Sequence, residues 1–170
     1  MIIEVNGKKP TIDPTVFIAP TAMIIGDVEI GADTNIWFQT IIRGDTNFIR
    51  IGALCNIQDA CVLHVVKDRH PVILEDGVVL GHRVVVHGCT VGRRSLIGIG
   101  AVVLDGAIVG EESIVGAGSV VSPGTVLPPR SLAMGTPARI VRTLADRDVE
   151  KIRGITDEYL ELTELYRAIS

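Results

Sequence analysis

In the segment from Val91 to Leu127, VGRRSLIGIGAVVLDGAIVGEESIVGAGSVVSPGTVL, an aliphatic residue recurs at every sixth position. A helix has a period of about 3.6 residues and a single strand a period of about 2, so a sustained period of six fits neither. It fits short strands separated by turns, with three strands to a coil and each coil stacked on the one before. The segment therefore predicts a parallel β-helix of triangular cross-section.

The same six-residue period covers most of the chain outside this segment. It is present from Ile12 to Ile42 and, after a skip, from Ile51 to Leu63. After a second skip we expect it to run unbroken from Ile73 to Leu127, beginning with Ile73, Val79 and Val85. Most repeats have a small residue four positions after the aliphatic one. Both series are expected to point into the coil.

The C-terminal part of the chain has a different pattern. After Gly135-Thr136-Pro137 the apolar residues follow helical spacing, with acidic residues between them. This spacing predicts an amphipathic helix from Ala145 to Ile169, which Gly154 could interrupt. Because 170 residues are few for two ordinary domains, we expect a β-helix over residues 1–143 and a tail over residues 144–170 that packs on it within the same domain.

The composition excludes several classes of protein. A formal net charge of -4 without any cluster of Lys and Arg argues against nucleic-acid binding. The chain has no signal-like N-terminus and no apolar run of bilayer length, which argues against a membrane protein. Cys55, Cys61 and Cys89 all fall on the small inward position, so we expect them to be buried and free. An odd number of unpaired cysteines fits a cytoplasmic protein.

Three of the four histidines lie close to the second skip. Leu63 and Val85 begin repeats that are one full coil apart, so His64 and His87 are expected on the same face of adjacent coils. Two imidazoles placed in this way can share one tetrahedral metal ion. The alternative is that they are ordinary solvated surface residues.

The other two histidines are expected to lie apart from this pair. His82 falls on the preceding side of the coil, toward a corner, and would point away from His64 and His87. It could complete a metal site only from a neighbouring molecule, which requires an oligomer with a metal at each interface. His70, in Arg69-His70-Pro71, has no such partner and is interpreted as a loop residue.

Seven short motifs stand in a fixed order along the chain, and together they carry a resemblance to a known family. They are Ile36-Trp37, Arg43-Gly44-Asp45, Asn56-Ile57-Gln58-Asp59, Val62-Leu63-His64, Gly81-His82, Val86-His87-Gly88-Cys89 and Met134-Gly135-Thr136-Pro137-Ala138-Arg139. In this order the chain resembles the γ-class carbonic anhydrase family of hexapeptide-repeat proteins over essentially its whole length. The repeats alone are shared with many acyltransferases, whereas the Arg-Gly-Asp, Asn-Ile-Gln-Asp and three-histidine set is far more specific.

The resemblance implies a left-handed β-helix assembled as a homotrimer, with zinc, or iron or cobalt, at each subunit interface. Histidines matching His64 and His87 would come from one subunit and the one matching His82 from the next. The implied activity is reversible hydration of carbon dioxide to bicarbonate by a metal-bound hydroxide. Three neutral nitrogens leave a position open for water, and the cation lowers the pKa of that water toward about 7.

The resemblance also implies roles for residues around the metal. Gln58 would orient the metal-bound hydroxide, and Asn56 would help to position the pocket. Arg43, Asp45 and Asp59 would form an ion-pair network near the site and across the subunit contact, since Arg binds carboxylates through two parallel hydrogen bonds. The alternative for Arg43 and Asp45 is a purely structural pair.

Three positions affect how fast such an enzyme would turn over. Tyr159 on the tail helix could reach the neighbourhood of the metal, or it could serve packing alone. The archaeal prototype of the family has acidic proton shuttles where this chain has Thr46 and the segment Val65 to Arg69. Neither Thr nor Lys shuttles protons near neutral pH at its ordinary pKa. Hydration activity is therefore expected to be slow, dependent on buffer or absent.

Two other functions remain open from the sequence. An acyltransferase built on the same β-helix would use one histidine as general base for a hydroxyl or amine that attacks an acyl-CoA thioester. A non-catalytic metal-binding or assembly module would use the flat faces of the β-helix to bind partners. Metal analysis separates the carbonic anhydrase from the acyltransferase.

Overall fold

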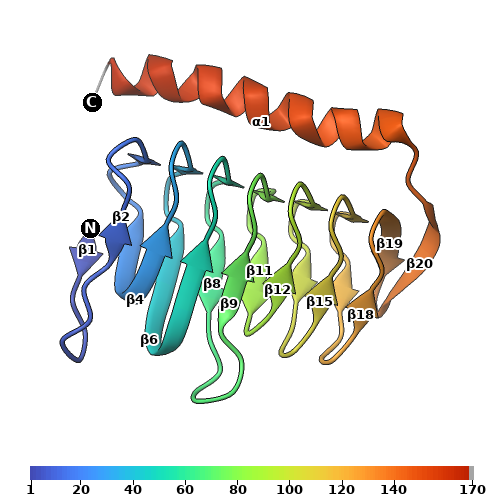
Figure 1. The fold of residues 1–170 in the computed structure, drawn as a ribbon, viewed down its shortest axis with the longest axis horizontal. Coiled ribbons are helices and arrows are strands. Elements are labelled where there is room, and N and C mark those ends of the chain that lie inside the picture. The colour runs from blue at the N-terminus through green and yellow to red at the C-terminus, as the bar shows by residue number, and fades with distance from the viewer. Residues whose placement is uncertain (169–170) are drawn as a thin grey trace.

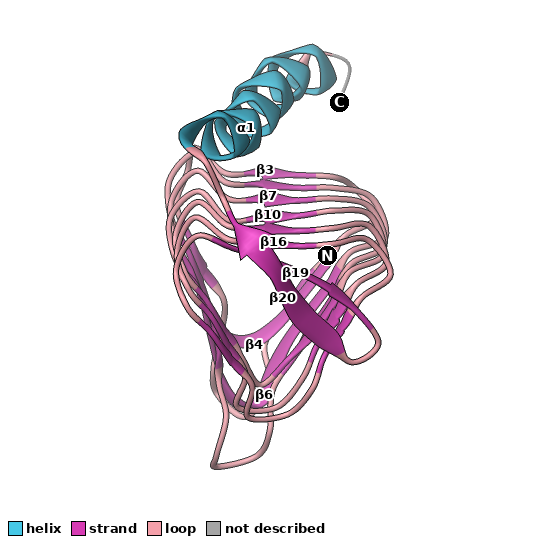
Figure 2. Cartoon of the chain, turned by 90° about the vertical axis from the view of Figure 1, so that its right-hand side faces the viewer, coloured by secondary structure: helices cyan, strands magenta, loops and turns pink. Residues whose placement is uncertain are grey.

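A computed structural model describes residues 1–168, which form a parallel β-helix with one long helix along its side (Figure 1). Seen end-on, the coils are triangular and α1 (Asp146–Arg167) lies over one of the three sides (Figure 2). The predicted fold is confirmed: an all-β solenoid of the left-handed hexapeptide type with a C-terminal α-helix. Within the described residues, no helix combines the length and the apolar character needed to cross a membrane.

Short parallel strands stacked on one another form the side beneath α1, which we call the α1 face. The last strand of this face pairs with an antiparallel strand that closes the C-terminal end. In chain order the strands are β3 (Phe17–Ile18), β5 (Asn35–Ile36), β7 (Asn56–Ile57), β10 (Val79–Leu80), β13 (Leu96–Ile97), β16 (Ile114–Val115), β19 (Ser131–Gly135) and β20 (Ala138–Thr143).

The second side, here called the histidine face, carries the predicted histidine pair. It contains β1 (Ile2–Ile3), the first halves of β4 (Met23–Ile30) and β6 (Ile41–Ile51), then β8 (Val62–His64), β11 (Val85–His87), β14 (Val102–Val103) and β17 (Val120–Val121).

The third face completes the triangle. It contains the second halves of β4 and β6, which run through the corner between the two faces. Its other strands are β2 (Thr11–Ile12), β9 (Val72–Leu74), β12 (Thr90–Val91), β15 (Ile108–Val109) and β18 (Val126–Leu127).

Aliphatic side chains stacked inside the coil form the core, as the six-residue period predicts. Ile36, Ile57 and Ile97 are fully buried, and Ile57 stands opposite Ile36 on the adjacent coil. Leu80 lies in register with both Ile57 and Ile97. One column of branched side chains therefore runs along the inside of each face.

The predicted register is wrong by one residue in the three repeats after the second skip. The residues expected to point inward there were Ile73, Val79 and Val85. Their immediate successors do so instead, namely Leu74, Leu80 and Val86. Since both members of each pair are aliphatic, the pattern does not distinguish them. The period returns to the predicted register at Val91 through a shortened corner, in which Gly88 has a φ of 54° that only glycine adopts at no steric cost.

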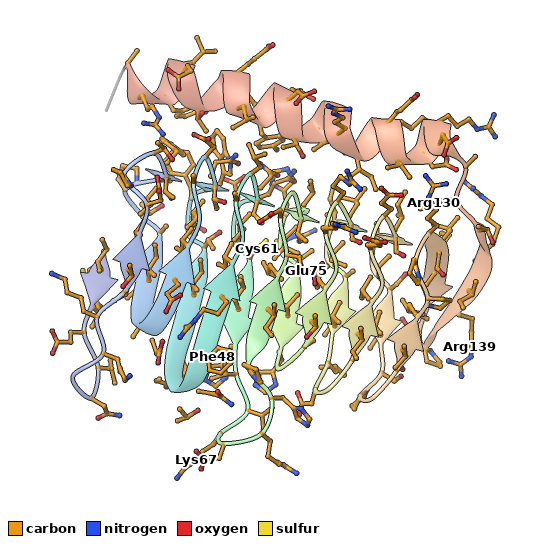
Figure 3. All side chains as sticks on the ribbon, in the orientation of Figure 1. Phe48, Cys61, Lys67, Glu75, Arg130 and Arg139 are labelled. Carbon is orange, nitrogen blue, oxygen red and sulfur yellow. The ribbon has the colours of Figure 1, made fainter. Side chains whose placement is uncertain are left out.

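Both skips are insertions at the corner between the histidine face and the third face. In the first, β6 continues through the corner from Ile41 to Ile51 as one bent strand. In the second, residues 65–71 form a loop closed by the bridge between Val66 and His70, with Lys67 near its tip (Figure 3). The insertions therefore lie at the end of the strands that carry the paired histidines.

A carboxylate at the first turn fixes the start of α1. Asp148 Oδ2 accepts hydrogen bonds from the backbone N–H of Ala145 at 2.9 Å and from Arg142 at 2.7 Å. Because Arg142 and that amide stabilise the charged form, the pKa of Asp148 lies well below its usual range. The helix continues through Gly154 without interruption. The predicted end at Ile169 lies outside the described residues.

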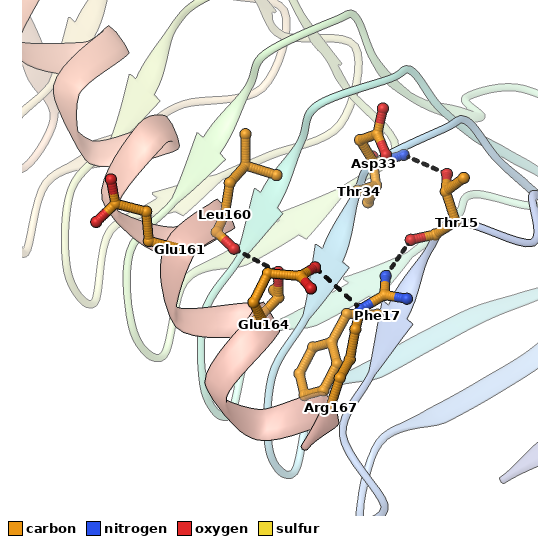
Figure 4. A pocket seen from close by; sticks show the side chains of 9 residues that line it. Thr15, Phe17, Asp33, Thr34, Leu160, Glu161, Glu164 and Arg167 are labelled. Atoms are coloured by element: carbon orange, nitrogen blue, oxygen red, sulfur yellow. Dashed lines mark hydrogen bonds and ion pairs between the residues drawn. The ribbon is translucent and has the colours of Figure 1, made fainter.

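Aromatic packing holds the other end of α1 against the β-helix. The ring of Trp37 meets Tyr159 and Tyr166 edge-on, with centroids 5.2 and 5.1 Å away. Arg167 donates to the carbonyl of Thr15 beside a cavity of about 290 Å³ (Figure 4). With both ends fixed, α1 shields the outward residues of the α1 face from water.

The cysteine positions give a direct test of the core. Cys55, Cys61 and Cys89 are free and buried as predicted, and burial raises the pKa of each thiol to about 12. We expect a thiol reagent such as DTNB to label none of them in the native protein at pH 7 and all of them in denaturant. Lys67→Cys, at the exposed loop tip, is the positive control. Rapid labelling of native wild-type protein would contradict the assigned register.

Candidate metal centre

His64 and His87 stand directly opposite one another on adjacent strands. Leu63 pairs with Val86, rather than with Val85 as the sequence count had it, and this pairing places the two histidines in register. His64 Nδ1 lies 3.1 Å from His87 Nε2. The two rings therefore converge at the corner next to both insertions.

The outer nitrogen of each histidine contacts a carboxylate. His64 Nε2 lies 3.1 Å from Asp45 Oδ1, and His87 Nδ1 lies 2.5 Å from Asp105 Oδ1. A neutral imidazole has a single N–H, and a carboxylate attracts it. If each ring donates its proton to its Asp, the lone pairs of the two inner nitrogens face each other. A cation between them relieves this repulsion, as in carboxylate–histidine–zinc arrangements.

The spacing of the inner nitrogens fits a metal ion. Two nitrogen ligands about 2.0–2.1 Å from zinc at a tetrahedral angle are about 3.3 Å apart. The observed separation of His64 Nδ1 and His87 Nε2, 3.1 Å, is close to this value. The pair thus offers two of the nitrogen donors that a zinc site would need, at a suitable spacing and with a carboxylate behind each ring.

Arg43 and Asp45 lie beside His64, as the resemblance implies. Arg43 is in register with His64 and its guanidinium forms an ion pair with Asp45. Burial alone would raise the pKa of Asp45, but hydrogen bonds from Arg43 and His64 hold it below its usual range. The residue between Arg43 and Asp45 is Gly44. A larger residue does not fit there, because its Cβ would lie 2.5 Å from the carbonyl oxygen of Asp27 on the adjacent coil.

His82 does not join this pair within one chain. It lies in the turn between β10 and β11, where its Nδ1 is 2.9 Å from Asp59 Oδ2. The six residues from His82 to His87 include the whole of β11, and the five steps between them span up to roughly 16 Å in an extended chain. Among residues 1–168, no three His, Cys, Asp or Glu side chains are placed to hold a metal. Asp59 is thus beside His82, away from Arg43 and Asp45.

Gln58 belongs to the His82 side of the molecule. Its Oε1 accepts from the backbone N–H of His82 at 3.2 Å, and its Nε2 donates to Asn56 Oδ1 at 2.9 Å. Asn56 in turn donates to Asn35, which also accepts from Trp37 Nε1 at 2.8 Å. This buried chain of amides fixes the orientation of Gln58, with its carbonyl oxygen toward His82.

Tyr159 adjoins Gln58 from the side of α1. Both line a cavity of about 430 Å³ between the helix and the α1 face, together with Ile99 and Ile155. Burial and the negative charge of Asp59 raise the pKa of Tyr159. Since its ring also packs edge-on against Trp37, Tyr159 has a clear packing role and lies away from the histidine pair of its own chain.

One chain therefore carries two half-sites at different corners. The pair half-site contains Arg43, Asp45, His64, His87 and Asp105. The lone-histidine half-site contains Asn56, Gln58, Asp59, His82 and Tyr159.

Sequence reasoning missed two residues of these half-sites. Asp105 follows His87 by 18 residues, the length of a regular coil, and counting one coil onward would have found it. Asn35 stands opposite Asn56 on the adjacent coil, and counting back from Asn56 by register would have found it. Each contacts a residue that the sequence did single out.

Comparison with known proteins gives relatives along the whole chain. Residues 88–123 match the family model for the bacterial transferase hexapeptide (six repeats). A carbonic anhydrase of Geobacillus kaustophilus is 46% identical over 169 residues, which cover 99% of this chain and 92% of the relative. Gamma carbonic anhydrase 1, mitochondrial, of Arabidopsis thaliana is 38% identical over 172 residues, which cover 98% of this chain and 62% of the relative.

A solved structure has the same fold over its full length. It belongs to a Bacillus cereus protein described provisionally as an acetyltransferase, with a TM-score of 0.97 and 42% identity, and the match covers 100% of this chain and 98% of that one. The fold alone does not separate the two activities, because hexapeptide β-helices carry both names. The Geobacillus kaustophilus relative, which matches nearly end to end, bears a carbonic anhydrase name. This chain belongs to the γ-class carbonic anhydrase family of hexapeptide-repeat proteins.

Proposed function

We propose that this protein catalyses the reversible hydration of carbon dioxide to bicarbonate at a zinc ion held by His64 and His87 of one chain and His82 of a second. Iron or cobalt could occupy the same position, since imidazole suits several of these metals. The convergence of His64 Nδ1 and His87 Nε2, each ring backed by a carboxylate, carries the proposal. The carbonic anhydrase names of the relatives support the choice of reaction.

The histidine face has a surface suited to a second copy of the chain. A column of outward aliphatic side chains runs along it, each opposite the next on the adjacent coil; Val62 is exposed and the others are half-buried. A contiguous apolar stripe of this kind is a candidate protein contact. The column consists of Met23, Ile41, Val62, Val85, Val102 and Val120.

The corresponding column of the third face is interrupted by polar residues. Glu29 and Arg50 stand opposite each other there and form an ion pair of 3.2 Å. Thr90 separates Ile73 from Ile108. Burial of even a paired Glu and Arg carries a desolvation penalty that their mutual attraction need not offset, so the histidine face is the better candidate for the subunit contact.

The placement of the half-sites favours a closed ring. His64 and His87 lie toward the corner with the third face, whereas His82 lies at the corner with the α1 face. A contact that brings the corner with His64 and His87 of one copy against the corner with His82 of a second copy uses two different surfaces, and is therefore heterologous. Heterologous contacts close into rings when the rotation between neighbouring copies permits. We propose a homotrimer, in which each of three interfaces would hold one complete ligand set.

A bound zinc ion would supply the nucleophile at neutral pH by lowering the pKa of a coordinated water. The side chains of the two half-sites would set the geometry around it. One amide hydrogen of Gln58 goes to Asn56 and one lone pair of its carbonyl to the backbone of His82. Its remaining hydrogen and lone pair would orient the reacting oxygen atoms. Asp45, held by Arg43, would keep His64 turned toward its partner ring.

Hydration releases one proton for every carbon dioxide consumed, and this proton must leave the site. The positions expected to hold acidic shuttles are occupied by the exposed Thr46 and by the loop with Lys67 near its tip. A threonine hydroxyl and a lysine ammonium are, as residue types, poor proton shuttles near neutral pH. Buffer molecules would therefore carry the proton away.

Proton export by buffer has a kinetic signature. Stopped-flow measurement with a pH indicator should show carbon dioxide hydration by the zinc-loaded protein that rises with buffer concentration and then levels off. The proton-export step limits the rate at low buffer, and another step limits it at high buffer. Fully metal-loaded protein without catalysis at any buffer concentration would contradict the proposed reaction.

The alternative of an acyltransferase is favoured by the description of the Bacillus cereus structure and by the transferase family model. The same preparations distinguish it. Metal-independent release of free thiol from acetyl-CoA in the presence of amine or hydroxyl acceptors would favour this function. Metal-loaded protein that catalyses neither reaction would favour a binding or assembly module.

Shared ligation can be tested by mixing inactive variants. His82→Ala and His64→Ala should each lose metal as pure proteins, although His82 is remote from the other ligands of its own chain. A 1:1 mixture refolded or co-expressed should regain about a quarter of the wild-type zinc, because that fraction of interfaces combines an intact pair with an intact His82. Lys67→Ala, at the exposed tip of the loop, is the control and should keep its metal. A mixture that regains no zinc would exclude ligation across the interface.

A further inference from the structure

We propose that Asp105 is a positioning residue for the metal: its carboxylate keeps His87 in the tautomer and orientation in which Nε2 faces His64. The inference rests on the metal site of the proposed function and adds a residue to it. Asp105 Oδ1 lies 2.5 Å from His87 Nδ1. The proton of the ring is thereby held on Nδ1, and the lone pair on Nε2 is left for a cation.

The backbone delivers this carboxylate to its place. Asp105 lies in the turn that follows β14, and the N–H of Gly106 donates to the carbonyl of Gly88 at 2.7 Å. On the other side, the N–H of Gly124 donates to the carbonyl of Asp105 at 2.9 Å. The turn is thus stacked between two neighbouring turns, one of which directly follows His87. The position of Asp105 is a property of the β-helix and does not depend on a bound ion.

The ring of His70 restricts the same turn from the side of the loop. A Cβ on Gly106 would lie 3.2 Å from Cε1 of His70, so the imidazole packs closely against the backbone of this turn. The loop of residues 65–71 thereby covers the turn that presents Asp105. His70 is a loop residue, as the sequence predicts, and this contact gives it a defined packing partner.

The arrangement that Asp105 excludes is as important as the one it favours. With its proton on Nε2 instead, His87 could donate directly to Nδ1 of His64, only 3.1 Å away. That hydrogen bond would join the two histidines and occupy both donor atoms needed by the metal. Asp105 makes this tautomer unfavourable, because its negative charge would then face the lone pair of Nδ1.

Asp45 and Asp105 interact differently with the imidazole rings of His64 and His87. Asp45 is shared between His64 and Arg43, so part of its charge is neutralised by the guanidinium. Asp105 directs its Oδ1 at His87. Loss of the Asp105 carboxylate should therefore act through His87 and leave the Arg43–Asp45 pair in place.

The test compares zinc affinity in Asp105→Asn with the wild type, by competition with a chromogenic chelator. We expect affinity to fall by about 10- to 100-fold, the usual cost of losing a carboxylate behind a ligating histidine, while the trimeric mass is retained. Asp68→Asn is the matched control. It removes the same charge from the exposed loop next to this turn, and its φ of 55° suits Asn. Its zinc affinity should equal that of the wild type.

A spectroscopic readout tests the same claim independently of affinity. Long-range ¹⁵N–¹H spectra of metal-free wild-type protein should show His87 protonated on Nδ1, and those of Asp105→Asn should show a shift toward Nε2. If the variant does not assemble, the His87 tautomer in the wild type decides the question. Equal zinc affinity in Asp105→Asn, or a wild-type His87 protonated on Nε2, would overturn the inference about Asp105 alone. A wild-type protein that binds no zinc would overturn the proposed function instead.

Discussion

The stacking of one coil on the next is the constraint on which the rest of this structure depends. Corresponding strands on adjacent coils pair in parallel, as Leu96 does with Ile114, 18 residues later. Their backbones are about 4.8 Å apart, so side chains at equivalent outward positions are forced into contact. This spacing brings His64 against His87 and places the carboxylate of Asp105 behind His87. In a solenoid, residues separated by one coil in the sequence therefore lie next to each other in space.

The same rigidity keeps the two half-sites of one chain apart. β11 separates His82 from His87 along the edge of the triangle, and no rotation of a side chain closes a gap of several strand residues. In the proposed assembly a neighbouring chain provides the missing ligand, so metal binding and association stabilise each other by linkage. The amide chain behind Gln58 and the carboxylates behind His64 and His87 then have the same purpose. They fix orientation before the chains meet, which lowers the cost of assembling the site.

The sequence predicted the fold well because the repeat is a property of spacing. It also predicted that His64 and His87 converge while His82 points elsewhere. It failed where two adjacent residues satisfy the pattern equally, as at Val85 and Val86, since only the shortened corner at Gly88 settles which one faces inward.

Contacts that depend on turns and on single side chains were beyond the pattern. Asp105 was missed because a carboxylate in a turn looks like ordinary surface until the turn is stacked on the one that follows His87. Asn35 was missed because its hydrogen bonds run sideways between coils to Asn56. The resemblance places Asp59 in a network with Arg43 and Asp45 near the site and across the subunit contact, and within one chain Asp59 lies beside His82. In each of these cases the register between adjacent coils decides which side chains are neighbours.

The central claim is that one metal ion is bound by histidines of two chains. Anomalous diffraction at the zinc absorption edge, from crystals of the zinc-loaded protein, tests it most directly. The account predicts one peak per chain, about 2.0–2.1 Å from His64 Nδ1 and His87 Nε2 of one molecule and from an imidazole nitrogen of His82 of its neighbour. A peak bound without His82, or full zinc loading with no peak at this corner, would contradict it.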